Sequence, residues 1–289
     1  MKKLKIGFTD THDHLAGFFH HVLSTRYDIE INNTNPDFLF FGDKNFGTDN
    51  LNFSKNDCTK IFFTGENQRP DDYDCHYAIT FDHNYNPWHY RLPLFVIYMW
   101  ALKHVHNTIY DRNYILNPEV KDKTGFATFV VQNPRCEERN NFFQKLNSIE
   151  KVDSGGPLYN NINAKLDGEA AKIDFLSTRK FNICFESMSY PGYVTEKILH
   201  AFYAGTIPIY WGSPTIEHDF NPKSFINVHN FKSQEEAIEY VLKVDEDDEL
   251  YDAIVRQPKF VGNVPPSYIF YNNFLNWFDA VVYQKILSR

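Results

Sequence analysis

Three side chains that could bind a charged ligand follow a strand and enter a helix. Residues 180–186 read KFNICFE, an apolar strand, and a helix is expected over 193–204. On a helical wheel, at about 100° per residue, Tyr193, Glu196 and Lys197 fall on one side and the apolar residues on the other. An aromatic ring, an acid and a base therefore take the place of the glycines that usually hold a dinucleotide at such a turn.

The position of Lys197 is what needs explaining. A first helical turn favours negative charge, because the helix dipole is positive there. A lysine fits if an anion such as a diphosphate binds between its ammonium group and the free backbone N–H groups. The alternative is a solvated helix face, extended by His200, on which Glu196 and Lys197 form a local pair. The residues alone leave both open, and Gly205 is expected to end the helix in the left-handed conformation.

The elements around this turn alternate between strands and helices. Apolar runs predict strands at 4–9, 27–31, 37–42, 59–66, 126–133, 180–186, 206–212 and 224–231. Helical spacing predicts helices at 15–25, 91–106, 137–149, 193–204, 233–244 and 267–287. The helix at 233–244 carries a capping box formed by Ser233 and Glu236.

This succession indicates the α/β class, with two doubly wound domains facing a central cleft. A polar stretch at 107–125 suggests the boundary. We expect an N-terminal α/β domain at 1–120, a C-terminal α/β domain at 121–266, and a helix at 267–289 that could pack back on the first domain.

The composition limits the classes of partner. A net charge of −8 and a pI near 5.8 argue against a protein that coats nucleic acid. The apolar run at 92–102 is too short to span a bilayer, and the first residues do not read as a signal peptide. We expect a cytoplasmic protein, or one peripheral to the inner membrane. The four cysteines show no spacing typical of a metal site.

Several motifs together resemble one family of enzymes. FNICFE, GYVTEKI, TIPIYWGSP and FNPKSFINVHNF, all within 180–231, are similar to the signature region of the α1,3-fucosyltransferases of glycosyltransferase family 10, which includes bacterial members. FFTGENQRPD at 62 and NPRCEERNNFFQKLNSI at 133 extend the resemblance more loosely. It implies a GT-B fold, in which the C-terminal domain binds GDP-fucose.

The resemblance also implies roles at the donor. Lys197 would meet the diphosphate, and Tyr193 and Glu196 would bind hydroxyl or phosphate groups of GDP-fucose. Arg139 can hold two phosphate oxygens at once, although a solvated first-turn arginine is the alternative. Glu186 would orient the sugar or the backbone. Side-chain cations would then stabilise the departing diphosphate, so no metal and no other cofactor is expected to be required.

The acceptor side is predicted from the N-terminal half. Glu66, near the end of the strand at 59–66, is the candidate general base for an inverting transfer of fucose to the 3-OH of GlcNAc or glucose, as in N-acetyllactosamine. His12, Tyr85 and Trp88 are candidate acceptor contacts. For the DTHDH motif at 10–14, zinc binding is the alternative to a solvated loop.

Three other functions have to be weighed. Another GT-B nucleotide-sugar transferase would share the architecture, and a non-catalytic glycan-binding protein would share the aromatic surfaces. A glycosidase could use Glu66 and Glu186 as its two carboxylates, but would leave Arg139 and Lys197 without a role.

Ser187 stands where related sequences often have asparagine. No heptad repeat supports a coiled-coil dimer, so the oligomeric state is left open.

Overall fold

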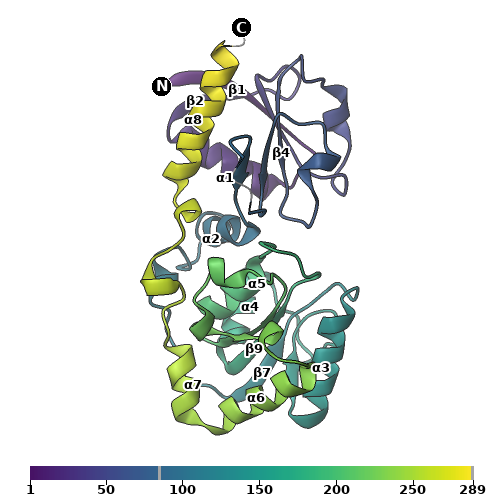
Figure 1. Cartoon of the computed structure of the whole chain (residues 1–289), viewed down its shortest axis with the longest axis vertical. Helices are drawn as coiled ribbons and strands as arrows, with labels where there is room; N and C mark the ends of the chain where they lie inside the picture. The colour runs from purple at the N-terminus through teal and green to yellow at the C-terminus, as the bar shows by residue number, and fades with distance from the viewer. Residues whose placement is uncertain (84–85, 288–289) are drawn as a thin grey trace. The chain divides into compact units, whose positions relative to one another are not determined.

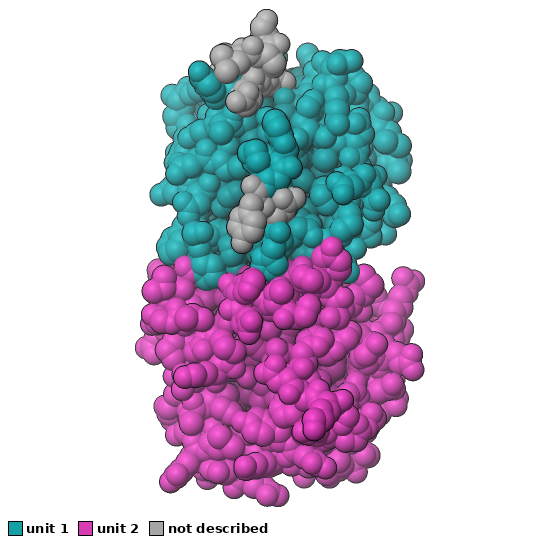
Figure 2. Space-filling model, in the orientation of Figure 1, with its two compact units in different colours: residues 1–101, 266–289 teal, residues 102–265 magenta. Residues whose placement is uncertain are grey.

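The computed structural model describes residues 1–83 and 86–287, and the chain divides into two compact units (Figure 1). Unit 1 comprises Met1–Ala101 and Pro266–Arg289, and unit 2 comprises Leu102–Pro265 (Figure 2). The segment 102–120, which the sequence-based domain limits assign to the first domain, groups here with unit 2.

Unit 1 is built on a six-stranded parallel sheet in the order β2-β1-β3-β4-β5-β6. Its strands are β1 (Lys2–Thr9), β2 (Tyr27–Ile31), β3 (Phe38–Phe41), β4 (Thr59–Phe63), β5 (Tyr77–Thr80) and β6 (His89–Arg91). Every residue of β3 and β4 is buried, as continuous apolar runs in a parallel sheet require. The strands β5 and β6 were not predicted.

Three helices belong to this unit or border it: α1 (Asp13–Ser24), α2 (Leu94–His104) and α8 (Tyr271–Leu287). The C-terminal helix α8 packs on α1 and on the sheet. Phe274 lies 5.7 Å from Phe19, and Phe278 lies 5.4 Å from Phe38, measured between ring centroids. These aromatic contacts tie the end of the chain to its beginning.

Unit 2 has a five-stranded parallel sheet in the order β11-β10-β9-β7-β8. The strands are β7 (Gly125–Phe129), β8 (Val152–Ser154), β9 (Arg179–Phe185), β10 (Ile207–Trp211) and β11 (Ile226–Asn227). The helices are α3 (Glu137–Ile149), α4 (Gly168–Ser177), α5 (Glu196–Tyr203), α6 (Gln234–Glu246) and α7 (Asp248–Val255). The prediction of two doubly wound parallel α/β units is confirmed, whereas β8 and α4 were not predicted.

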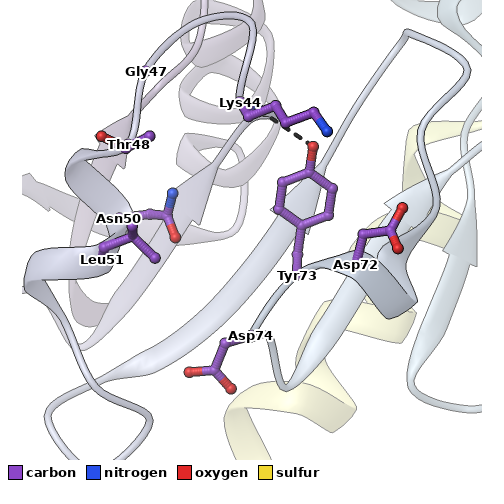
Figure 3. Close-up of a pocket in the computed structure, with 8 residues that line it drawn as sticks. All are labelled: Lys44, Gly47, Thr48, Asn50, Leu51, Asp72, Tyr73 and Asp74. Carbon is purple, nitrogen blue, oxygen red and sulfur yellow. Dashed lines mark hydrogen bonds between the residues drawn. The ribbon is translucent and has the colours of Figure 1, made fainter.

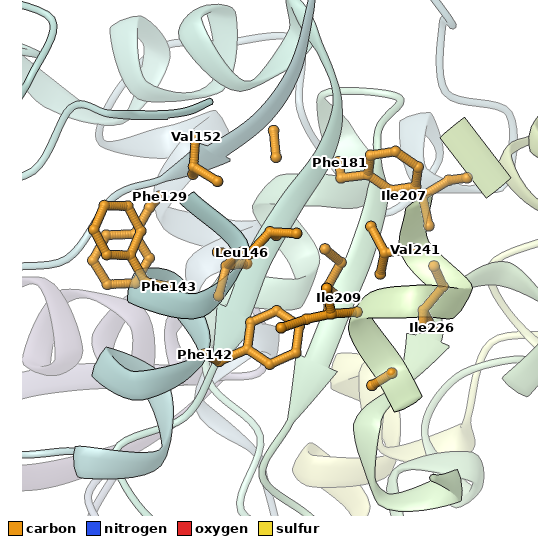
Figure 4. Packing of buried hydrophobic residues seen from close by; sticks show 14 of the residues in the cluster. Phe129, Phe142, Phe143, Leu146, Val152, Phe181, Ile207, Ile209, Ile226 and Val241 are labelled. Atoms are coloured by element: carbon orange, nitrogen blue, oxygen red, sulfur yellow. The ribbon is translucent and has the colours of Figure 1, made fainter. Parts of the chain in front are cut away.

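The core of unit 2 brings α3 and α6 against the strands (Figure 4). Phe142 and Leu146 of α3 and Val241 of α6 are completely buried. Burying a large apolar side chain contributes about 1.5–3 kcal/mol, so this cluster anchors α3, the helix that carries Arg139.

The strand orders place ligand residues at defined edges. In each sheet the chain proceeds to one side of the first strand and then returns to its other side, which creates a switch point beside that strand. The switch point lies between β7 and β9 in unit 2, and between β1 and β3 in unit 1. Ligands of open α/β sheets bind at the carboxyl ends of the strands next to such a point.

No helix among residues 1–83 and 86–287 combines the length and the apolar character needed to cross a bilayer.

Candidate functional site

A buried carboxylate organises the carboxyl edge of unit 2. Glu186 directly follows β9 and is completely buried. Its Oε1 accepts the backbone N–H of Thr195 at 2.7 Å, and its Oε2 accepts the Thr195 hydroxyl at 2.7 Å and the Lys197 ammonium at 3.0 Å. A buried charge is stable only when it is paired and hydrogen-bonded. Glu186 therefore connects the end of β9 to the beginning of α5.

The segment before α5 is a tight turn, and it corrects one prediction. The helix begins at Glu196, so Tyr193 lies ahead of it and is not on its face. Gly192 has φ of 80°, a conformation that favours glycine. Its N–H donates to the hydroxyls of Ser213 at 2.8 Å and Thr215 at 3.0 Å. Tyr193 is nevertheless buried here, with its hydroxyl 3.3 Å from that of Ser187.

Glu196 and Lys197 are charged and partly enclosed. Burial acts to lower the pKa of Lys197, but the carboxylates of Glu186 and Glu196 outweigh it and raise the pKa. Burial acts to raise the pKa of Glu196, but Lys197 and Lys172 outweigh it and lower the pKa to about 2. Lys172, from α4, lies 4.0 Å from Glu196. Both groups of the pair are therefore ionised at neutral pH.

The outer side of α5 is not a solvated face. The helix α4 packs on it, and His200 is 1% exposed, with its Nε2 3.2 Å from Oε2 of Glu169. Burial holds the pKa of His200 well below its ordinary value. The solvated-face interpretation of this helix is wrong, because α4 covers it. Gly205 has φ of 58° after the helix, which confirms the predicted left-handed cap.

Arg139 brings a second cation to this edge from the first turn of α3. It is 2% exposed, so the solvated interpretation of this arginine is also wrong. Its Nη2 donates to the carbonyl of Asn133, while its buried Nε makes no hydrogen bond to any residue that the structure describes. Burial lowers the pKa of Arg139, and the nearby Glu186 and Tyr193 are among the groups that oppose this shift.

The five predicted donor residues lie near the switch point of unit 2: Arg139, Glu186, Tyr193, Glu196 and Lys197. Arg139 follows β7, and Glu186 follows the adjacent strand β9. Lys197 is already bound to Glu186 and to the Thr195 hydroxyl, at 2.7 Å from the latter, yet 23% of its side chain stays exposed. The arrangement offers an anion one partly exposed ammonium group and one guanidinium with an open donor.

In unit 1, Glu66 lies at the carboxyl edge of the sheet but outside the strand to which it was assigned. The strand β4 ends at Phe63, and Glu66 is exposed in the following loop. Its backbone N–H donates to the Thr64 hydroxyl at 3.0 Å, and that hydroxyl donates to Asp43 Oδ2 at 2.8 Å. Asp43 is 1% exposed, so the loop that carries Glu66 is anchored by a buried acid.

Two of the candidate acceptor contacts, His12 and Trp88, lie at opposite edges of the sheet. His12 follows β1 at the same carboxyl edge as Glu66, and its ring lies 4.6 Å from that of Phe46. Trp88 precedes β6 and therefore lies at the opposite, amino edge of the sheet. It is 55% exposed and packs near Tyr77. Tyr85 lies outside the described residues.

Comparisons with known proteins place the chain in a family. Residues 120–256 match the model "Glycosyltransferase family 10 (fucosyltransferase) C-term", and residues 5–98 match "Alpha-(1,3)-fucosyltransferase FucT N-terminal domain". A crystal structure of an α1,3-fucosyltransferase is 30% identical and superposes with a TM-score of 0.80, over 97% of this chain and 90% of that chain. The chain belongs to glycosyltransferase family 10. This match also confirms the GT-B-like fold class.

Two other relatives of this family 10 chain add detail. The α1,3-fucosyltransferase FucT of Helicobacter pylori is 38% identical over 249 residues, which are 76% of this chain and 51% of that protein. The chain thus spans about half the length of this curated relative. A crystal structure of an α1,3-fucosyltransferase with GDP-fucose has a TM-score of 0.75 at 30% identity, over 97% of this chain and 91% of that chain.

Sequence reasoning overlooked several residues that build the site of this family 10 chain. Thr195 and Lys172 contact the charged groups beside β9, and Asp43 follows β3 in unit 1, whereas Asp10, after β1, was noted only as part of the DTHDH motif. A signal for the two aspartates was present, because each comes directly after an apolar strand of a parallel sheet. Within the described part of the chain, no three His, Cys, Asp or Glu side chains are grouped so that they could hold a metal ion.

Proposed function

We propose that the protein is an α1,3-fucosyltransferase that uses GDP-fucose. The acceptor is a GlcNAc- or glucose-containing oligosaccharide such as N-acetyllactosamine, and fucose is transferred to its 3-OH with inversion. The observation that carries this proposal is the buried Arg139, whose Nε–H is accepted by no residue that the structure describes, at the switch point beside the Glu186–Lys197 pair. The family match supports it, since a relative of similar structure is known with GDP-fucose.

Arg139 and Lys197 act on the leaving group in this proposal. As the bond between fucose C1 and the phosphate oxygen breaks, its electron pair goes to the diphosphate. Cations fixed before the reaction stabilise this growing negative charge without having to reorganise. Glu186 holds Lys197 in position, and Tyr193 and Glu196 complete the donor contacts.

Glu66 acts on the acceptor. Its carboxylate removes the proton of the 3-OH while that oxygen forms a bond to C1 of fucose. A single displacement of this kind inverts the anomeric carbon, so a β-linked donor yields an α-linked product. The proposal assigns charge stabilisation to side-chain cations and therefore needs no divalent metal. The exposure of Glu66, on an anchored loop at the carboxyl edge of unit 1, supports its access to an acceptor.

The first experiment measures product formation from GDP-fucose and N-acetyllactosamine, with and without excess chelator, followed by linkage analysis. We expect an α1,3-linked trisaccharide at equal rates in both samples. Slow release of GDP without a trisaccharide would retain the donor site and reject this acceptor. The absence of both GDP binding and GDP release would reject the proposal.

A second experiment compares Glu66→Gln with Glu30→Gln, a control in β2 whose carboxylate pairs with Lys3 on the surface. Loss of one general base lowers turnover by about 10²–10⁴-fold. We expect that loss for Glu66→Gln, with GDP affinity unchanged, and full activity for the control. Unchanged turnover in Glu66→Gln would refute its role as the base.

A further inference from the structure

Unit 1 contains a half-open cavity of about 180 Å³ whose purpose the proposed reaction does not explain (Figure 3). We call it the Tyr73 pocket. Its lining comes from two irregular segments that cover the sheet: Lys44, Gly47, Thr48, Asn50, Leu51, Asp72, Tyr73 and Asp74. In Figure 3, Tyr73 stands between Lys44 and Asp72 and faces Asn50 and Leu51.

Two walls of the Tyr73 pocket are held in place by packing and hydrogen bonds. The ring of Tyr73 stacks on Phe62 at 4.1 Å, and its hydroxyl accepts the Lys44 backbone N–H at 3.2 Å. Across the pocket, Asn50 is 7% exposed, and Asp10 Oδ2 accepts both its backbone N–H at 2.8 Å and its side-chain amide at 2.9 Å. Sites held in place before binding lose less entropy when a ligand arrives.

Gly47 and Lys60 support the wall of the Tyr73 pocket that Asn50 forms. Gly47 has φ of 148°, and a Cβ there would lie 2.4 Å from Asp10 Oδ1, so the chain passes where only glycine fits. Lys60 is 1% exposed, and its ammonium donates to the carbonyls of Asn50 at 3.1 Å and Phe53 at 3.0 Å. A buried lysine used in this way fixes the backbone rather than the ligand.

The charges in the Tyr73 pocket select a neutral ligand. Asp74 is already compensated, since Lys55 lies 3.1 Å from it and lowers its pKa. In the part of the chain that the structure describes, the Lys44 ammonium and the Asp72 carboxylate make no hydrogen bond or ion pair. Lys44 can donate hydrogen bonds to a ligand, Asp72 can accept them, and their two charges cancel. An anionic ligand would be repelled by Asp72, and a cationic ligand would be repelled by Lys44.

The same pocket also has an apolar side. Tyr73 presents a ring, and Leu51 is 72% exposed beside it. A sugar has both properties that are required here, because its C–H face packs on an aromatic ring and its hydroxyls donate and accept hydrogen bonds. A neutral oligosaccharide is therefore the class of ligand that matches all of the walls.

The Tyr73 pocket is connected to the loop of Glu66. Gln68 donates its backbone N–H to the Glu66 carbonyl at 2.7 Å, and its Oε1 accepts the Tyr73 hydroxyl at 3.4 Å. We propose that this pocket binds a neutral sugar unit of the acceptor other than the unit that receives fucose. This inference rests on the proposed function, because it takes the acceptor to be an oligosaccharide.

The test uses a tetrasaccharide of two N-acetyllactosamine units and four forms of the whole chain. These are the wild type, Asp72→Asn, Thr48→Phe, designed to enlarge a lining side chain into the cavity, and the control Asp71→Asn, whose carboxylate is exposed outside the pocket. Binding is measured by saturation-transfer NMR without donor, and the KM of the tetrasaccharide by fucose transfer. Thermal unfolding and GDP affinity show whether each variant keeps its fold and donor site.

We expect the Kd and the KM for the tetrasaccharide to rise about tenfold in Asp72→Asn, as loss of a hydrogen bond to a charged group predicts. Thr48→Phe should bind more weakly still, and Asp71→Asn should match the wild type. If the wild type binds but transfers no fucose, the binding difference still supports the pocket while the proposed function fails. Equal binding by all four proteins, or no binding by the wild type, would overturn the inference.

Discussion

Replacing Glu186 with glutamine tests whether a buried charge organises the donor side. The carboxylate accepts three hydrogen bonds, from the Thr195 N–H and the Thr195 hydroxyl at 2.7 Å each and from the Lys197 ammonium at 3.0 Å. A glutamine side chain has one acceptor oxygen and one NH₂ group. Whichever position the NH₂ takes, it faces the Thr195 N–H or the Lys197 ammonium, and one donor is left opposite another.

The size of the effect follows from burial. Removing one partner of a buried ion pair costs about 3–5 kcal/mol, because the other charge is left uncompensated. Lys197 keeps 23% of its side chain exposed and can recover some hydration. We therefore expect Glu186→Gln to lower the free energy of unfolding by about 3 kcal/mol, near the low end of that range. Denaturant unfolding, followed by fluorescence and far-UV circular dichroism, measures this change.

The same substitution should weaken donor binding. Without the carboxylate, neither Thr195 nor Lys197 is fixed, so we expect the Kd for GDP, measured by calorimetry, to rise at least about tenfold. Glu196→Gln is the control for stability, since its lysine partners lie farther away, at 3.8 and 4.0 Å. It should lose about 1 kcal/mol or less. If Glu186→Gln stays within that limit and binds GDP normally, the argument from burial is wrong.

Three other predictions concern the elements around the site. Gly205→Ala should lower the free energy of unfolding by more than about 2 kcal/mol, because its Cβ would lie 2.2 Å from a carbonyl oxygen. The control Gly168→Ala, with φ of 80° and open space around it, should lose only about 1 kcal/mol. Equal denaturation midpoints of the two variants would contradict this prediction. Burial raises the pKa of Glu169 above 4.5, so the folded state loses stability as the pH rises from 4.5 through this raised pKa. Glu169→Gln should therefore raise the Tm at pH 7 but not at pH 4. A lower Tm of the variant at pH 7 would refute this direction. Lys172→Met should raise the KM for GDP-fucose about threefold with little change in kcat, because the lysine charge, 4.0 Å from Glu196, positions that carboxylate. Lys172→Arg keeps the charge and should restore the KM. A loss confined to kcat would oppose this role.

Local patterns were sufficient for elements that depend on near neighbours. One half of the predicted capping box of α6 forms, since Ser233 Oγ accepts the Glu236 N–H at 3.2 Å, while Glu236 Oε2 accepts the N–H of Lys232 at 2.7 Å. The left-handed Gly205 likewise follows from the needs of a helix end. The buried strands β3, β4, β7, β9 and β10 were predicted from apolar runs, because a strand covered on two faces has no polar side.

Other features depend on contacts that a linear pattern does not contain. The helix α4 went unpredicted because GEAAKIDFLS opens with glycine and shows no clear apolar stripe. Its presence over α5 buries the face around His200 that one of the two alternatives took to be solvated. Likewise, Trp88 was a candidate acceptor contact as an aromatic residue, but it precedes a strand whereas Glu66 follows one.

The sequence by itself determined the α/β class, the doubly wound pattern and the residue types able to bind a diphosphate, because these follow from periodicity and side-chain chemistry. Only the tertiary structure decided which of them meet. Arg139 and Glu186 are far apart in the chain, and the pairing of β7 with β9 brings their strands together after the detour through β8 and α4. Burial then gives the charges of Arg139 and Lys197 their strength, since electrostatic interactions grow as water is excluded.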